Sequence, residues 1–331
     1  MSSPKFRGTL LSTEPVIIYS GSYAARPEPS EFSLLQDALS SHEVTWLVLV
    51  AWTAEPGSTS ARTIADWSKG RLAKHPKHRI IFMANTMHEE RNLSALGVEA
   101  FFIHQNCFVD RSLFKPNDGS QTSASAQRYM AVYNAQFLEF KRHSLCVNLP
   151  QDQLALIGYN FGAGYFSKVK TLLPNAYYAN LSTDGSTKWL TQASVNQIYN
   201  ESSVALCLSQ AEGAMHASME YLLSGLPVVT TLSKGGRDYF FDGRFVRWCN
   251  DDPASIADSV HALASELIPR SFVREQTIEK VDKHLAERLP LLAKKIGITN
   301  QQLTDSLKAS YNDKLITPVE IDDILSRLQL A

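Results

Sequence analysis

Two glutamates in one short stretch of the chain have the chemistry to bind hydroxyl groups. Glu212 and Glu220 are eight residues apart. A carboxylate accepts hydrogen bonds from sugar hydroxyls, and the N–H groups at the start of a helix attract anions. If a helix begins near Met215, Glu220 lies about 8 Å further along it, at about 1.5 Å per residue. A nucleotide sugar fits this spacing because it has hydroxyls at both ends and a diphosphate between them. The simpler interpretation is two surface residues of an ordinary helix.

The residues around the two glutamates predict a parallel β-α-β unit. Gly225 ends the helix of this unit, as glycine often does. Ligands of open α/β sheets bind outside the carboxyl ends of the strands, which places Glu212 at the predicted ligand edge. The order is strand, turn of small residues, helix and strand, over residues 204–208, 209–215, 216–223 and 226–231.

The surrounding pattern has the form of a family signature. The sequence E-G-(six residues)-E, followed by L-x-S-G-L-P-V-V, resembles that of the retaining GT-B glycosyltransferases often called glycosyltransferase family 4. The resemblance implies that Glu212 contacts the donor sugar and that Glu220 contacts the ribose. The backbone that follows Glu212 would hold the diphosphate, and the start of the helix would lie near the sugar. The further donor-binding residues implied in this way are Gly213, Ala214, Met215 and His216.

A basic pair upstream adds positive charge. Residues 135–142 read AQFLEFKR and resemble the family segment G-R-L-x-x-x-K-G, in which the arginine and lysine contact the donor diphosphate. Lys141 matches the lysine, Gln136 stands in place of the arginine, and Arg142 is the nearest replacement. A departing nucleoside diphosphate carries negative charge, so without a metal a fixed cation must stabilise it. The alternative is that Lys141 and Arg142 are solvated residues of a surface helix.

Other loops of this half end at the same predicted edge. Residues 160–164 form a glycine-containing loop, and the resemblance places residues 182–185 near the nucleobase. After the second strand, Lys234 and Arg237 flank two glycines and could add charge to a bound anion. A glycine turn with solvated cations explains these residues equally well.

The first half alternates apolar runs with helical patterns, which predicts a parallel sheet covered by helices. In the resembling family the first turn of this half faces an interdomain cleft, so Gly21 and Ser22 are candidate cleft residues. His88 follows a predicted strand and is a further candidate, although a surface histidine is the simpler explanation. The predicted strands cover residues 16–20, 44–52, 79–85 and 100–104.

The chain is expected to form an α/β GT-B protein, with two Rossmann-like domains that face a cleft and a helical C-terminal extension. Residues 107–116 resemble the family's bridge out of the first domain, and residues 117–126 are polar and small, as in a linker. The predicted parts are an acceptor domain, a nucleotide-sugar donor domain and the extension, over residues 1–120, 121–269 and 270–331.

Composition excludes several classes of protein. The formal net charge of −1 over 331 residues shows no basic footprint for nucleic acid. The four cysteines form no C-x-x-C pair and the nine histidines have no metal-ligand spacing, so no metal or disulfide framework is expected. The longest apolar run, residues 46–52, is too short to span a bilayer, and no signal core precedes it. We therefore expect a soluble cytoplasmic protein without a transmembrane segment.

The resemblance implies a retaining, metal-independent hexosyltransferase. Its donor would be a nucleoside-diphosphate sugar, used as co-substrate without any cofactor, and its acceptor a glycan, a lipid or a small molecule. Lys141 would stabilise the leaving diphosphate, Glu212 orient the sugar and Glu220 hold the ribose. Two alternatives stay open: a nucleotide-sugar 2-epimerase-like isomerase on the same fold, and a non-catalytic nucleotide-binding scaffold, for which Gln136 is the argument. The donor sugar and base, the acceptor and the oligomeric state are not specified.

Overall fold

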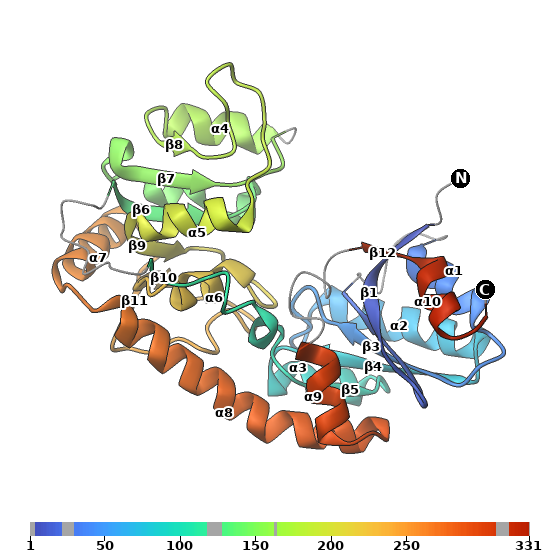
Figure 1. Ribbon diagram of the computed structural model, residues 1–331. Coiled ribbons are helices and arrows are strands. Elements are labelled where there is room, and N and C mark those ends of the chain that lie inside the picture. Colours follow the sequence, from blue (N-terminus) through green and yellow to red (C-terminus); the bar gives the residue numbers. More distant parts are fainter. Residues whose placement is uncertain (1–3, 22–29, 118–127, 162–163, 309–317, 331) are drawn as a thin grey trace. The chain divides into compact units, whose positions relative to one another are not determined.

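The computed structural model describes residues 4–21, 30–117, 128–161, 164–308 and 318–330. The chain divides into two compact units, which are described separately. Unit 1 consists of Met1–Asp110 together with Asp282–Ala331, and unit 2 is Arg111–Val281. Each unit has a mostly or wholly parallel sheet with helices, which confirms the predicted α/β class (Figure 1).

Unit 1 has a six-stranded sheet in the order β12-β1-β2-β3-β4-β5. Strands β2 to β5 are parallel, and β1 is antiparallel to both of its neighbours. Trp46 on β3 is fully buried in the core of this unit, against Phe6 and Phe32. The strands are β1 (Lys5–Thr13), β2 (Val16–Ser20), β3 (Val44–Leu49), β4 (His78–Ala84), β5 (Ala100–Phe102) and β12 (Pro318–Glu320).

Three helices of unit 1 begin where the sequence supplies a capping side chain. Ser30, Ser58 and Thr86 each accept a hydrogen bond from a backbone N–H in the first turn of the helix that follows. These helices are α1 (Glu31–Ala38), α2 (Thr59–Lys74) and α3 (Met87–Ala95), and the C-terminal part of the chain adds α9 (Asn300–Lys308) and α10 (Ile321–Arg327).

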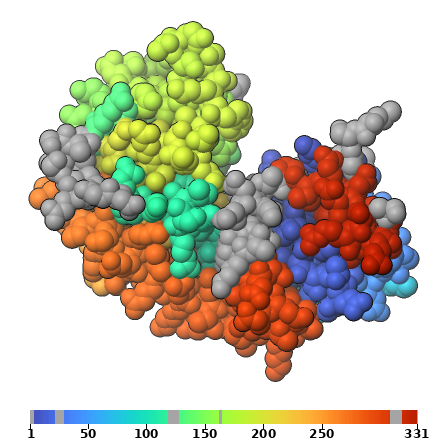
Figure 2. Space-filling view, in the orientation of Figure 1, coloured from blue at the N-terminus to red at the C-terminus, as the bar shows by residue number. Residues whose placement is uncertain are grey.

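The last residues of the chain complete the sheet that the first residues begin. Residues 318–320 lie in the predicted helical extension but form strand β12, which pairs with β1. Ile321 and Ile324 of α10 lie in the same core cluster as Phe6. Figure 2 shows the C-terminal residues, in red, packed against the N-terminal residues, in blue. The C-terminal stretch therefore contributes a strand and core residues to unit 1.

Unit 2 has a wholly parallel sheet in the order β11-β10-β9-β6-β7-β8. The strand order reverses between β6 and β9, so the carboxyl ends of these two strands form a topological switch point, where ligands of such sheets bind. The strands are β6 (Tyr129–Asn134), β7 (Leu154–Ile157), β8 (Tyr177–Tyr178), β9 (Ser202–Cys207), β10 (Val228–Thr231) and β11 (Val246–Cys249).

The β-α-β unit predicted around the two glutamates is β9-α6-β10. Helix α6 begins at His216 and ends at Leu223, and Gly225 follows it with a φ of +76°. Asp252 caps α7, as its position before Pro253 suggests. The helices are α4 (Gly164–Leu172), α5 (Gln192–Asn200), α6 (His216–Leu223), α7 (Pro253–Ser265) and α8 (Arg270–Ile296), of which α8 begins in unit 2 and ends in unit 1.

No helix within the described ranges combines the length and the apolar character needed to cross a membrane.

Candidate functional site

The turns after β6 and β9 meet at the switch point of unit 2. After β6 the chain follows β7 a little further, because Ala135 N donates to Ile157 O at 2.8 Å. It then forms a short 3-10 turn, Glu139–Lys141. Gln210 N, in the turn after β9, donates to Phe140 O at 3.2 Å. The fold thus brings together the two segments that the sequence singled out, although 71 residues separate Lys141 from Glu212.

Lys141 and Glu212 form a buried ion pair. Lys141 Nζ donates to Glu212 Oε1, and the two side chains are only 10% and 8% exposed. Tyr133 Oη donates to Lys141 O at 2.5 Å, which fixes the backbone that carries the ammonium group. Burial excludes the interpretation of Lys141 as a solvated surface residue. It also means that each charge depends on the other, because a buried charge without a partner is costly.

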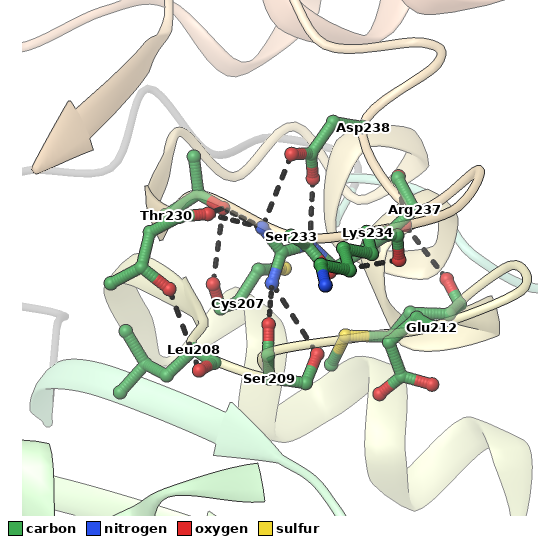
Figure 3. A network of polar contacts seen from close by, with 12 residues as sticks. Cys207, Leu208, Ser209, Glu212, Thr230, Ser233, Lys234, Arg237 and Asp238 are labelled. Carbon is green, nitrogen blue, oxygen red and sulfur yellow. Dashed lines mark hydrogen bonds and ion pairs between the residues drawn. The ribbon is translucent and has the colours of Figure 1, made fainter. Parts of the chain in front are cut away.

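Backbone hydrogen bonds hold the turn of Glu212 against the loop after β10. Glu212 N donates to Lys234 O at 2.9 Å (Figure 3). Lys234 N donates to Gln210 O at 3.0 Å. Gly236 N donates to Gly213 O at 2.8 Å. Met215, the N-cap residue of α6, has no side-chain oxygen to accept from the first turn. The positive end of this helix therefore points into the same turn as Glu212.

Arg237 supports this turn from within the protein. Its guanidinium is 1% exposed and donates to Ser209 O at 2.7 Å and to Thr230 Oγ1 at 2.8 Å. Asp238 forms an ion pair with Arg237 Nε at 2.6 Å (Figure 3). Arg237 thus joins the carboxyl ends of β9 and β10, and the suggestion that it adds charge for a ligand is wrong because its N–H groups have protein partners.

Glu220 lies one turn into α6 and is partly buried. Tyr199 Oη donates to Glu220 Oε2 at 2.7 Å, and Asn134 Nδ2 at the end of β6 donates to Tyr199 Oη at 2.6 Å. Burial raises the pKa of Glu220 to about 7, although the hydrogen bond from Tyr199 acts in the opposite direction. A carboxyl group with this pKa changes charge near neutral pH.

Gln136 faces a pocket of about 400 Å³ at the carboxyl ends of β6, β7 and β8. The rings of Tyr159 and Trp189 lie 5.7 Å apart at its wall, and Trp189 is 84% exposed. Asn180 holds two of the pocket loops together, because it accepts from Gly158 N at 2.9 Å and donates to Lys188 O at 3.1 Å. The lining residues are Gln136, Tyr159, Asn160, Phe161, Asn180, Thr187, Lys188 and Trp189.

Arg142 is held by three partners on neighbouring elements. It has a left-handed backbone, with a φ of 54°. Its Nε donates to Leu208 O, its Nη1 to Asp251 Oδ2 and its Nη2 to Thr231 Oγ1, each at 2.6 Å. The side chain therefore connects the ends of β9 and β10 to the residues before α7.

The remaining sequence candidates lie in the first turn of α6 and in unit 1. His216 is the first residue of α6, and burial lowers its pKa, which favours the neutral imidazole. Gly21 directly follows β2, and its N–H donates to Arg7 O at 3.0 Å. His88 is exposed in the first turn of α3. Ser22 lies outside the described residues.

Sequence reasoning missed Tyr199 and Asn134. Neither residue belongs to a recognisable motif, and 65 residues separate them along the chain. The one available signal was the position of Asn134 at the carboxyl end of a predicted strand, at the edge where ligands bind.

Within the ranges that the structure describes, no three histidine, cysteine, aspartate or glutamate side chains lie close enough together to hold a metal ion.

Comparison with known proteins finds similarity in structure alone. No family model and no curated protein matches the chain. A glycosyltransferase from Rickettsia africae is 10% identical, with a TM-score of 0.51 over 88% of this chain and 83% of that protein. TarM from S. aureus is 17% identical, with a TM-score of 0.52 over 75% of this chain, which spans only 50% of TarM. HepE from Anabaena, in complex with UDP, is 13% identical, with a TM-score of 0.48 over 81% of this chain and 78% of HepE.

The architecture follows from the two parallel-dominated sheets, the switch point in unit 2 and the similarity to TarM and to the glycosyltransferase from Rickettsia africae. The fold of the chain is that of the GT-B glycosyltransferases.

Proposed function

We propose that the chain is a glycosyltransferase that moves a sugar from a nucleoside-diphosphate donor to an acceptor, with retention of configuration and without a metal. The observation that carries this proposal is the arrangement at the switch point of unit 2. There, Lys141 and Glu212 form an ion pair beside the start of α6, and Glu220 lies one turn further along the same helix. The fold shared with the glycosyltransferase from Rickettsia africae supports the same class of activity.

The diphosphate would bind between Lys141 and the start of α6. An ammonium group has three N–H donors, of which Lys141 uses one on Glu212, so two can meet phosphate oxygens. When the bond from the anomeric carbon to the phosphate oxygen breaks, negative charge grows on the leaving diphosphate. Lys141 and the positive end of α6 are fixed in place to stabilise it.

Glu212 would hold the donor sugar through its hydroxyl groups. Its Oε1 accepts from Lys141, so Oε2 can accept from the sugar. With retention, the acceptor oxygen bonds to the anomeric carbon on the face that the phosphate leaves. The proton of the acceptor hydroxyl then moves to the leaving phosphate, so this step requires no protein base.

The pocket beside Gln136 would hold the nucleobase. A planar heterocycle can stack on exposed aromatic rings such as Tyr159 and Trp189, and stacking of this kind is tolerant of the base. The amide of Gln136 offers one acceptor and one donor to the edge of the base. Glu220 would bind the ribose between this pocket and the diphosphate.

Calorimetric titration with a panel of nucleoside diphosphates and their sugars tests the proposal. We expect one base to bind with micromolar affinity, and Lys141→Ala and Glu220→Ala each to lose about 1–3 kcal/mol, the usual cost of removing a charged hydrogen-bonding group. Lys168→Ala is the matched control, because Lys168 is an exposed lysine paired with Glu139 on the surface of unit 2. Absence of nucleotide binding, or equal binding by all variants, would contradict the proposal.

A non-catalytic nucleotide-binding scaffold is the second candidate. It is favoured by the positions of Gln136 and Arg142, because the amide carries no charge and the guanidinium already has three partners. Product analysis with the bound donor separates the candidates. A transferase forms a new glycoside or releases free sugar, an isomerase returns an epimeric nucleotide sugar, and a scaffold leaves the donor intact. Activity that survives a chelator supports the metal-independent mechanism.

A further inference from the structure

Tyr199 lies between Asn134 and Glu220 in a buried chain of hydrogen bonds. Its side chain is fully buried, and its Oη is 2.6 Å from Asn134 Nδ2 and 2.7 Å from Glu220 Oε2. A tyrosine hydroxyl has one proton to donate. Because the Asn134 amide donates to this oxygen, the hydroxyl proton must point to Glu220.

This geometry leaves one oxygen of Glu220 for a ligand. Oε2 accepts from Tyr199, and among the described side chains no other group hydrogen-bonds the carboxylate. The rotation of the carboxyl group is therefore restrained by a partner that is itself fully buried and hydrogen-bonded to Asn134. Oε1 is therefore held in one orientation, as an acceptor for hydroxyl groups.

The packing around Tyr199 keeps it in place. Its ring makes an edge contact with Tyr221, with ring centroids 4.9 Å apart. Arg270, the first residue of α8, donates to Tyr199 O at 3.3 Å, to Ser202 O at 2.5 Å and to Ser224 O at 3.1 Å. The guanidinium thus ties the end of α5 to the end of α6, so that Tyr199 and Glu220 keep their relative position.

We propose that Tyr199 is a positioning residue for ribose recognition, which orients Glu220 so that its free oxygen accepts from the ribose hydroxyls of the nucleotide. The inference rests on the proposed nucleotide-binding function and goes further, because it assigns the selectivity for ribose to a residue that does not touch the ligand. The chain should then prefer a ribonucleotide to the corresponding 2′-deoxyribonucleotide, and this preference should depend on the Tyr199 hydroxyl.

The test is the ratio of affinities for a nucleoside diphosphate and its 2′-deoxy analogue. Tyr199→Phe keeps the ring and removes the hydroxyl, and we expect it to reduce the ratio about tenfold, the order of one hydrogen bond to a charged group. Tyr221→Phe is the matched control, because its hydroxyl accepts from Asn134 N at 2.5 Å and does not bond Glu220. Tyr221→Phe should leave the ratio unchanged, even if it lowers the melting temperature as much as Tyr199→Phe does.

A pH profile separates positioning from a loss of stability. The Tyr199 hydrogen bond lowers the pKa of Glu220, so Tyr199→Phe should raise this pKa and move the rise in ribose preference to higher pH. Tyr199 and Tyr221 are the titratable neighbours of Glu220 in the described structure, and burial holds both of their pKa values well above 10, so neither titrates in this range.

Different results contradict different steps. If the wild-type protein binds no nucleotide, the proposed function fails and the inference fails with it. If nucleotide binds but the wild type has no ribose preference, or Tyr199→Phe keeps both the ratio and the pH profile, the inference alone is overturned. Should Tyr199→Phe not fold, Asn134→Ala removes the amide that orients the hydroxyl, and it should lower the ratio in the same direction.

Discussion

The two charges of the Lys141–Glu212 pair depend on each other, because both side chains are removed from water. Breaking a buried pair leaves one charge without compensation, whereas replacing both partners with apolar groups is often nearly neutral. The pair is therefore expected to shape the stability of unit 2 as well as its chemistry. Each of the two effects can be measured separately.

Lys141→Met should destabilise the protein by about 3–5 kcal/mol, because Glu212 stays buried without its partner. The double variant Lys141→Met/Glu212→Leu should recover most of this loss. Lys168→Met is the control, since the Lys168–Glu139 pair is 67% and 75% exposed and should contribute less than about 1 kcal/mol. Urea unfolding of the wild type and the three variants measures these differences in stability. If Lys141→Met loses no more stability than Lys168→Met, the buried pair contributes little to stability.

Nucleotide affinity should depend on the charge of Glu220. Its pKa of about 7 means that the carboxylate, which accepts hydrogen bonds from ribose, gives way to the carboxylic acid as pH falls. Affinity should therefore decrease from pH 8 to pH 5.5, by at most about tenfold per pH unit because one proton is linked to binding. Calorimetry across this range measures the slope, and Glu220→Gln should remove it. An unchanged slope in that variant would assign the pH dependence to another group.

The raised pKa of Glu220 makes folding stability change with pH in the opposite direction to nucleotide affinity. The folded-state pKa of Glu220 is raised above its ordinary value of 4.5, so the folded protein binds more protons than the unfolded chain between about pH 4.5 and 7. This group therefore contributes stability that is fully present below pH 4.5 and is lost as pH rises through 7. Nucleotide binding is therefore expected to be strongest at higher pH, whereas Glu220 favours folding at lower pH.

The sequence could predict which site residues lie close together only where local backbone geometry sets the distance between them. Glu212 lies in the turn before α6 and Glu220 lies in α6 itself, so their spacing in sequence sets their spacing in space. The contacts of Tyr199 were not predictable, because they depend on how α5 packs beside α6. The three partners of Arg142 come from loops that are distant in sequence, and no local pattern indicates them.

At the scale of elements, the ends of the helices are strongly constrained. Three helices are followed by a glycine with positive φ: α3 by Gly97 at +77°, α6 by Gly225 at +76° and α8 by Gly297 at +78°. Gly225 was recognised in the sequence as a stop signal, and Gly97 has the same role after α3. Their surroundings differ, since a Cβ at Gly97 would meet nothing within 4 Å, whereas one at Gly225 would lie 2.5 Å from Arg270 Cβ.

Gly225→Ala should therefore be more harmful than Gly97→Ala. Both variants pay the left-handed strain of about 1–2 kcal/mol. Gly225→Ala should lose about 1–3 kcal/mol more, because its methyl group overlaps Arg270 and displaces the start of α8. Urea unfolding measures the loss of stability in each variant, and hydrogen exchange shows which unit is affected. Equal losses would mean that α8 moves away at little cost.

Strands were predicted where apolar residues form clear runs, and β1 shows where this fails. Its pairing with β2 shifts register between Leu10 and Ser12, so Leu10 and Leu11 are both buried and the alternation of a regular strand is broken. Gly8 also lies within this strand, where glycine is unusual. The β9-α6-β10 unit was predictable because its strands, turn and stop are all local signals.

At the scale of the molecule, each unit has its own sheet, but only unit 2 is a single continuous segment. Membership of residues 282–331 in unit 1 was not predictable, because it depends on the pairing of β12 with β1 across more than 300 residues. The parallel sheets themselves followed from alternating strands and helices. Long-range pairing of short strands has no comparable local signal.

Ile324→Ala should weaken unit 1 and leave nucleotide binding by unit 2 intact. Ile324 is 2% exposed in the core of unit 1, and truncation of a buried isoleucine costs about 2–5 kcal/mol. Asp323→Ala, at an exposed position on the same helix, should have little effect. Hydrogen exchange should show faster exchange in β1 and β2 for the first variant only. Equal loss of protection in β6 and β9 would mean that the units do not unfold separately.

The pairing of β1 with β12 also sets an order of events during synthesis. A ribosome completes Arg111–Val281 before it reaches the residues of β12, so unit 2 can fold while β1 still has an open edge. Domains usually fold from the N-terminus as they emerge. In this protein β1 is synthesised before unit 2 and β12 after it, so the sheet of unit 1 gains its β12 edge only after Arg111–Val281 has been made.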